Sequence, residues 1–154
     1  MADTKGSVDY KASMNKLESL LDDYLGKKAP ALPENIKDTL VSIAPYLAIV
    51  GIVISVPAIL ALLGIGAMFG PLVGYGLHYS FLYIVGIITL AISMVLEALA
   101  VPGLFKRAKS AWTLMYYSSL VGVVANLLQG SLSGAIIGGL IGLYVVFQLK
   151  PKYK

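Results

Sequence analysis

Hydrophobic residues run in long stretches along this chain, while charged residues gather at its start, in one internal loop and at its end. From Thr39 to Phe105 the single formal charge is Glu97, and from Ser110 to Leu149 there is none. Apolar runs of about 18 residues or more with few charges are typical of membrane-spanning helices. The pattern therefore predicts a transmembrane domain over residues 36–149 with four spans, at about 39–64, 77–101, 111–129 and 132–149.

Proline and glycine mark the ends and the irregular points of these spans. Pro45 and Pro57 each remove a backbone hydrogen bond and predict kinks in the first span. The glycine-rich stretch 64–76 is a poor helix interior and predicts a connector. Pro102 and Gly103 predict the end of the second span, and a tight turn at 130–131 joins the third span to the fourth.

Residues 1–35 form a polar segment with an amphipathic helix at about 10–25. Its apolar residues recur at helical spacing, namely Met14, Leu17, Leu20, Leu21, Tyr24 and Leu25. Such a helix contacts either a protein or the membrane surface. Helices that bind lipid usually carry a polar face rich in Lys and Arg, whereas residues 1–38 hold six Lys and seven acids. We therefore favour a protein contact, and we expect an all-α membrane four-helix bundle with a short N-terminal amphipathic helix.

Composition narrows the classes of protein that this chain can belong to. Of its 154 residues, 58% are hydrophobic and only 13% are charged, about half the charge of an average soluble domain. These values exclude a soluble enzyme, a disordered linker and a nucleic-acid-binding module. The absence of cysteine excludes disulfides and thiolate chemistry.

The positive charges are explained by membrane topology. With four spans, all Lys and Arg residues fall on one side, which the positive-inside rule assigns to the cytoplasm together with both termini. Beyond residue 38 the topology determinants are the loop 106–109 and the basic tail 150–154, that is Lys106, Arg107, Lys109, Lys150, Lys152 and Lys154. The expected location is the cell membrane.

A row of small residues on the fourth span is the clearest packing pattern. Gly130, Gly134, Gly138 and Gly142 recur every four residues, which leaves a smooth face where another helix can approach closely. The third span carries a partner row of Ser118, Gly122 and Asn126. The two rows pack within one hairpin, or the glycine face joins subunits of a homo-oligomer. The spacing leaves both open.

Two residues are candidates for an ion or proton site. Glu97 is the one acid inside a span, and intramembrane carboxylates are functional candidates by default. It lies about one turn from the end of its span, so the competing interpretation is an interfacial acid that is solvated or forms an ion pair with Lys106, Arg107 or Lys109. His78 is the lone histidine, and an interfacial hydrogen bond explains it more simply than a metal ligand does.

The spans contain no catalytic triad, no paired carboxylates and no nucleotide motif, so neither enzyme activity nor a cofactor nor a metal is expected. The stretch 102–118 and the tail 142–154 resemble uncharacterised small four-span bacterial membrane proteins. The resemblance implies a bacterial inner-membrane protein and brings no activity with it. We expect a non-enzymatic protein that acts by helix packing and interaction, as a scaffold or accessory subunit, with membrane lipid and a homo-oligomer or membrane protein as partners. The alternative is a small oligomeric channel or proton-coupled transporter.

Overall fold

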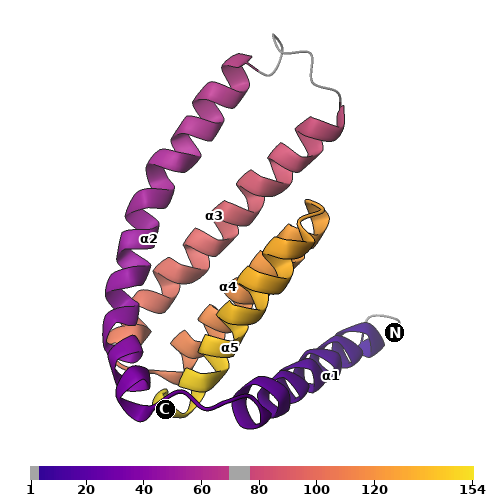
Figure 1. The fold of residues 1–154 in the computed structure, drawn as a ribbon. Helices are drawn as coiled ribbons and strands as arrows, with labels where there is room; N and C mark the ends of the chain where they lie inside the picture. Colours follow the sequence, from indigo (N-terminus) through magenta and orange to yellow (C-terminus); the bar gives the residue numbers. More distant parts are fainter. Residues whose placement is uncertain (1–3, 70–76) are drawn as a thin grey trace.

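The computed structural model describes residues 4–69 and 77–154, and within them every regular element is helical (Figure 1). The α-helices are α1 (Thr4–Leu21), α2 (Glu34–Phe69), α3 (Leu77–Phe105), α4 (Lys109–Leu128) and α5 (Leu140–Leu149). π-Helical turns extend α1 over Asp22–Lys28 and precede α5 over Gly134–Gly139, and a 3-10 turn follows at Lys150–Lys152. The prediction of an all-α bundle is confirmed.

Within residues 4–69 and 77–154, four helical stretches are long and apolar enough to cross a membrane, as expected of a multi-pass membrane protein. They are Glu34–Leu60, Phe81–Phe105, Lys109–Leu128 and Gly134–Lys152. The full length of α2 is much greater than the thickness of the hydrocarbon core of a bilayer, since its 36 residues span about 54 Å at 1.5 Å per residue.

Helices α2 and α3 extend beyond the ends that the sequence predicted for the first and second spans. α2 includes both Pro45 and Pro57 and continues to Phe69, so the first part of the expected connector 64–76 is helical. The remaining residues, 70–76, lie outside the described residues. α3 passes through Pro102 to Phe105. A proline in the last turn of a helix loses one backbone bond without ending the helix, because the following residues still bond to the turn before it.

The bundle is packed most tightly at one end. α2 and α3 lie side by side, and α4 and α5 form a shorter hairpin against α3 (Figure 1). The main cluster of buried apolar side chains lies at the ends of these helices that carry the charged loops, and consists of Val41, Ala100, Leu104, Ala111, Trp112, Tyr116, Leu143, Val146, Phe147, Leu149 and Tyr153. We call this the charged end of the bundle. Elsewhere α2 and α3 expose large apolar side chains, as lipid-facing helices do.

α1 stands apart from the other helices. It leaves the charged end obliquely, and its N-terminal part lies clear of the bundle (Figure 1). The π-helical turns 22–28 make the contact with α5. The amphipathic helix predicted at 10–25 is therefore present, within a longer helical segment that runs from Thr4 to Lys28.

Candidate functional site

Trp112 of α4 is the centre of the packing at the charged end. Its indole Nε1–H donates a hydrogen bond to the carbonyl oxygen of Val146 at 2.7 Å. Its ring stacks parallel to that of Tyr116, with centroids 5.7 Å apart, and meets Phe147 edge-on at 5.5 Å. Aromatic pairs in these geometries add to the stabilisation that burial provides. They fix α5 against α4, and so create a rigid base for the segments that dock on α5.

Gln148 joins this base to the N-terminal segment. Its side chain is 3% exposed. Its Nε2 donates to the carbonyl oxygens of Leu25 at 2.8 Å and Gly26 at 3.4 Å, and its Oε1 accepts from the backbone N–H of Leu32 at 3.2 Å. The last carbonyls of a helix have no partner within it. Gln148 therefore caps the helical segment that ends at Lys28, and it also holds the turn that follows.

Lys150 adds an electrostatic contact one half-turn further along. Its ammonium lies 3.2 Å from a carboxylate oxygen of Glu18 and 3.5 Å from one of Asp22. The same ammonium sits over the ring of Trp112, 4.9 Å from its centroid. The three side chains of this ion-pair group are partly buried, so solvent screens them less than it would a fully exposed pair. Lys150 thus sets the register of α1 against α5.

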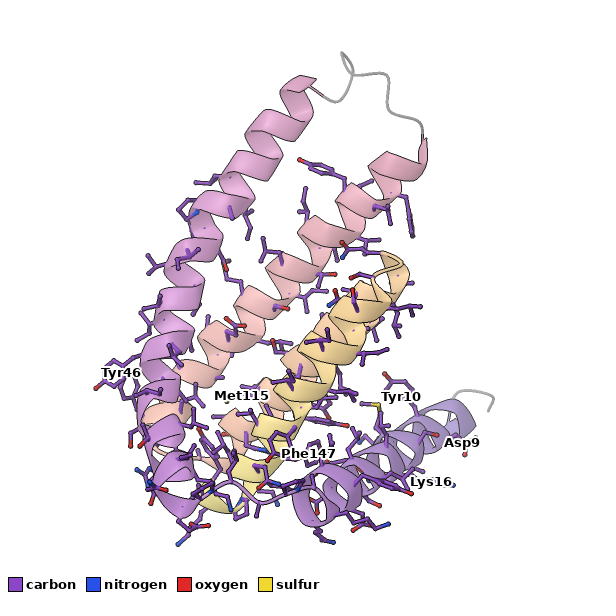
Figure 2. The ribbon with its side chains drawn as sticks, viewed as in Figure 1. Asp9, Tyr10, Lys16, Tyr46, Met115 and Phe147 are labelled. Carbon is purple, nitrogen blue, oxygen red and sulfur yellow. The ribbon has the colours of Figure 1, made fainter. Side chains whose placement is uncertain are left out.

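An exposed apolar row runs along α1 and onto the π-helical turns that follow it, beside Leu21 and Leu25, which pack against the core. Tyr10, Leu17 and Tyr24 are spaced by seven residues, and Leu20 lies beside them. These four side chains are between 39% and 70% exposed. Figure 2 shows Tyr10 at the part of α1 that lies away from α2. We call Tyr10, Leu17, Leu20 and Tyr24 the α1 stripe; seven-residue spacing of this kind is used when a helix packs on a second helix.

Glu97 lines a cavity between the spans. The cavity has a volume of about 380 Å³ and is bounded by α2, α3, α4 and α5. Its wall is mainly aliphatic, and its polar groups come from Glu97, Ser118 and Ser119. A Cβ atom placed on Gly51 would lie 3.4 Å from the Glu97 carboxylate, so the missing side chain at Gly51 makes room for the acid.

The ion pair that the sequence suggested for Glu97 can be compared with this geometry. Among the described residues no Lys or Arg forms an ion pair with its carboxylate. The three cations proposed for it, Lys106, Arg107 and Lys109, lie in and after the α3–α4 loop. Ser119 donates its hydroxyl to the Met115 carbonyl, within α4. The structure therefore places Glu97 in an apolar cavity, where its carboxylate faces α2.

The glycine row of the fourth span divides into two kinds of position. A Cβ atom on Gly134 would collide with Asn126 of α4, and one on Gly139, which lies beside the row, would collide with Val123. Gly138 and Gly142 have no atom within 4 Å of such a Cβ. They and Gly122 border a cleft of about 190 Å³ between α4 and the fourth span. Packing within the hairpin and a subunit interface both stay predictions for the glycine row.

Two further sequence candidates have local roles or lie outside the description. The Asn126 amide donates to the Gly122 carbonyl one turn back in α4, at 2.8 Å, and not across to another helix. The backbone of His78 lies in α3, but its side chain is outside the described residues. Within the described part of the chain, no three His, Asp or Glu residues cluster as metal ligands would.

The basic residues of the α3–α4 loop and the tail come together at the charged end. The backbone N–H of Lys154 donates to the Arg107 carbonyl, and that of Lys109 donates to the Lys154 carbonyl, both at 2.9 Å. Lys152 forms ion pairs with Glu34 and Asp38, both at 2.8 Å. These contacts hold the tail between α2 and the loop.

Tyr153 is buried in the same tail. Its side chain is 5% exposed, and its hydroxyl has no hydrogen-bond partner among the described residues. Burial raises the pKa of this phenol above its ordinary value, although the charge of Arg107 acts in the opposite direction. The phenol therefore stays protonated in the folded chain to higher pH than a free tyrosine does.

Sequence reasoning identified the amphipathic helix, Glu97 and the basic residues, but it missed Gln148. Its contacts join residues more than 100 positions apart, so no local pattern could point to them. The one available signal was an amide within an apolar run, next to a basic tail. Buried amides of this kind need hydrogen-bond partners, which the N-terminal segment supplies.

Known proteins provide no relative from which a role for these sites could be transferred. No protein-family model matches the chain, and no curated protein and no solved structure matches it either. The resemblance of its second half to small bacterial membrane proteins therefore stays a prediction, and the function has to be argued from the sites themselves.

Proposed function

We propose that this protein is a non-enzymatic membrane protein that acts by interaction, as a scaffold or accessory subunit that presents α1 to a partner protein. The observation that carries the proposal is the α1 stripe, an exposed apolar row on a helical segment whose C-terminal end is fixed to the end of the fourth span by Gln148 and Lys150. A segment that is already helical and held at one end loses less conformational entropy when a partner packs on it than an unfolded segment does.

The charge of α1 favours a protein over a lipid surface as its partner. Residues 9–28 contain four Lys and four acidic residues, so this segment gains little from attraction to anionic lipid. Membrane-surface helices depend on a Lys- and Arg-rich polar face. A partner helix with a complementary apolar row, by contrast, would bury the α1 stripe and leave the mixed charges at the edge of the contact.

A photocrosslinking experiment in native membranes tests this proposal. A photoreactive residue replaces Leu17 in the full chain, and a matched variant carries it at Lys11, on the other side of α1. We expect the Leu17 variant to give one defined protein adduct, which the additional change Leu20→Asp removes, and the Lys11 variant to give none. An adduct of twice the subunit mass would identify a second copy of this chain as the partner.

Two outcomes of that experiment would contradict the proposal. One is crosslinking of position 17 to lipid alone. The other is an unchanged adduct pattern in the Leu20→Asp variant, because an apolar contact along the α1 stripe cannot tolerate a carboxylate at its centre.

A proton-coupled transporter is the second candidate, and the cavity beside Glu97 favours it. A carboxylate in an apolar cavity within the spans is the type of group that takes up and releases protons during transport. In liposomes, Glu97→Gln should abolish a pH-dependent flux that the unmodified protein supports. Gly51→Leu should also block the flux by filling the cavity, and Asp9→Asn, at an exposed site of α1, is the control. Absence of flux from the unmodified protein would count against this candidate.

A further inference from the structure

The described surface contains a second hollow, at the charged end and separate from the cavity beside Glu97. Its volume is about 470 Å³, and its lining comes from α2, the α3–α4 loop and the tail. The lining residues are Asp38, Lys106, Arg107, Pro151, Lys152 and Lys154. Backbone hydrogen bonds between Lys154 and the loop at Arg107 and Lys109 bring these distant segments together.

The charges in this hollow are not balanced by the protein. Lys152 is neutralised, because it pairs with Asp38 and Glu34. Lys106, Arg107 and Lys154 form no ion pair with any residue in the described ranges, and the Arg107 side chain donates a hydrogen bond to the hydroxyl of Ser42, at 3.5 Å. The four cations of the hollow and the two carboxylates that pair with Lys152 leave a net charge of +2, and the cations repel one another. An anion bound between them would remove that repulsion.

The backbone at Arg107 is a second, independent sign of a binding site. α3 ends with two hydrogen bonds, from the N–H of Ala108 to the Gly103 carbonyl at 2.8 Å and from the N–H of Arg107 to the Leu104 carbonyl at 3.1 Å. This is a Schellman motif, whose αL position is usually glycine. Arg107 occupies that position with a φ of 52°. Glycine would form the turn without strain, whereas arginine adds a cation to the hollow at a conformational cost.

The surroundings of the hollow indicate an anion that is attached to hydrocarbon. Phe105 directly precedes the loop, and Tyr46 lies one turn from Ser42 on α2. Their rings meet edge-on with centroids 5.4 Å apart, and both side chains are more than half exposed. Figure 2 shows Tyr46 pointing outward from α2. Exposed aromatic residues at the end of a span are typical of the membrane–water interface.

We propose that this hollow binds the phosphate headgroup of an anionic phospholipid, with Arg107, Lys106 and Lys154 contacting the phosphate and the acyl chains lying along the α2–α3 surface beside Tyr46 and Phe105. Basic pockets between helices at one membrane face bind such headgroups in this way. The site is independent of the α1 stripe and of the Glu97 cavity.

Native mass spectrometry of the full chain in detergent tests the assignment. The probes are short-chain phosphatidylglycerol, phosphatidylcholine with the same chains, and inorganic phosphate. We expect phosphatidylglycerol to bind at least about fivefold more tightly than phosphatidylcholine, and Arg107→Gly to weaken its binding by about fivefold. Because glycine suits the αL position, this variant removes the cation without disturbing the turn. Lys154→Gln should have a similar effect, and Lys16→Gln, on α1, should have none.

The same measurements can overturn the proposal. Equal binding of phosphatidylglycerol to the Arg107→Gly variant and to the unmodified protein would show that the hollow is not the site. Inorganic phosphate that displaces phosphatidylglycerol at similar concentration would assign the site to a free phosphate and contradict a lipid ligand. Equal affinity for the two lipids would show that the headgroup charge is not recognised.

Discussion

Replacing Gln148 by leucine should release the N-terminal segment from the bundle. The side chain keeps a similar volume, but its three hydrogen bonds, to Leu25, Gly26 and Leu32, are lost. A lost bond costs about 1 kcal/mol net, and a buried polar group left without a partner costs about 1 to 3 kcal/mol. The backbone groups of the released segment can form hydrogen bonds with water instead, which offsets part of this cost. We therefore expect docking to be weakened by about 2 to 4 kcal/mol.

Hydrogen exchange followed by mass spectrometry in nanodiscs measures this effect directly. A loss of about 2 to 4 kcal/mol corresponds to roughly 30- to 700-fold faster exchange of the amides that docking protects, near Leu25 and Leu32. Peptides from α3 and α4 should exchange as in the unmodified protein. Gln148→Glu is a sharper variant, because a carboxylate keeps the shape but would face the Leu25 carbonyl without a proton to donate. Gln129→Leu, at the other end of α4, is the matched control.

Unchanged exchange near Leu25 in both Gln148 variants would refute this reasoning. It would mean that the ion pairs of Lys150 and the bond from the Tyr144 hydroxyl to the Pro30 carbonyl are sufficient to hold the segment. Equal acceleration throughout the spans would also refute it, because it would show general unfolding instead of local release.

Three further predictions concern the packing at the charged end, each measured as the free energy of unfolding in detergent. Tyr153→Phe should stabilise the protein by about 1 kcal/mol, since it removes a buried hydroxyl without a partner in the described residues. Because burial raises the pKa of this phenol, the unmodified protein should lose stability as the pH rises above about 10, and the variant should lose less. Gly103→Ala should destabilise by about 1 to 3 kcal/mol, because its Cβ would lie 2.8 Å from that of Ala111, whereas Gly86→Ala, in open space, should not. Trp112→Phe should lower the free energy of unfolding by about 1 to 3 kcal/mol, because it leaves the buried Val146 carbonyl of α5 without its donor. No loss of stability in Trp112→Phe, or an equal loss in Gly103→Ala and Gly86→Ala, would contradict the packing at the charged end.

The spans could be predicted from the sequence because membrane helices satisfy their backbone hydrogen bonds locally and expose apolar side chains to lipid. That requirement produces uncharged runs that are visible without knowledge of any contact. The ends of the helices were harder to predict, since Pro102 interrupts a pattern but not the helix. At such positions the packing of neighbouring helices outweighs the local preference.

A site could be predicted only where a single residue stands out from its neighbours in the sequence. Glu97 is conspicuous as an acid in an apolar span, but the cavity around it depends on Gly51, which is distant in sequence. The hollow at Arg107 requires the tail to meet the α3–α4 loop, and the cap at Gln148 requires the fourth span to meet the N-terminal segment. Contacts of this range follow from the arrangement of the helices, which a single sequence does not encode in any local pattern.

The cap at Gln148 also imposes an order on the biosynthesis of the protein. The Gln148 amide binds the carbonyl of Leu25, 123 residues earlier in the chain. A ribosome makes the N-terminal segment first, at about 5 to 20 residues per second. Residues 4–28 therefore wait undocked until the fourth span has been made and inserted. During that interval their apolar side chains are accessible on both faces of α1, including the Leu21 and Leu25 side chains that later pack against the core.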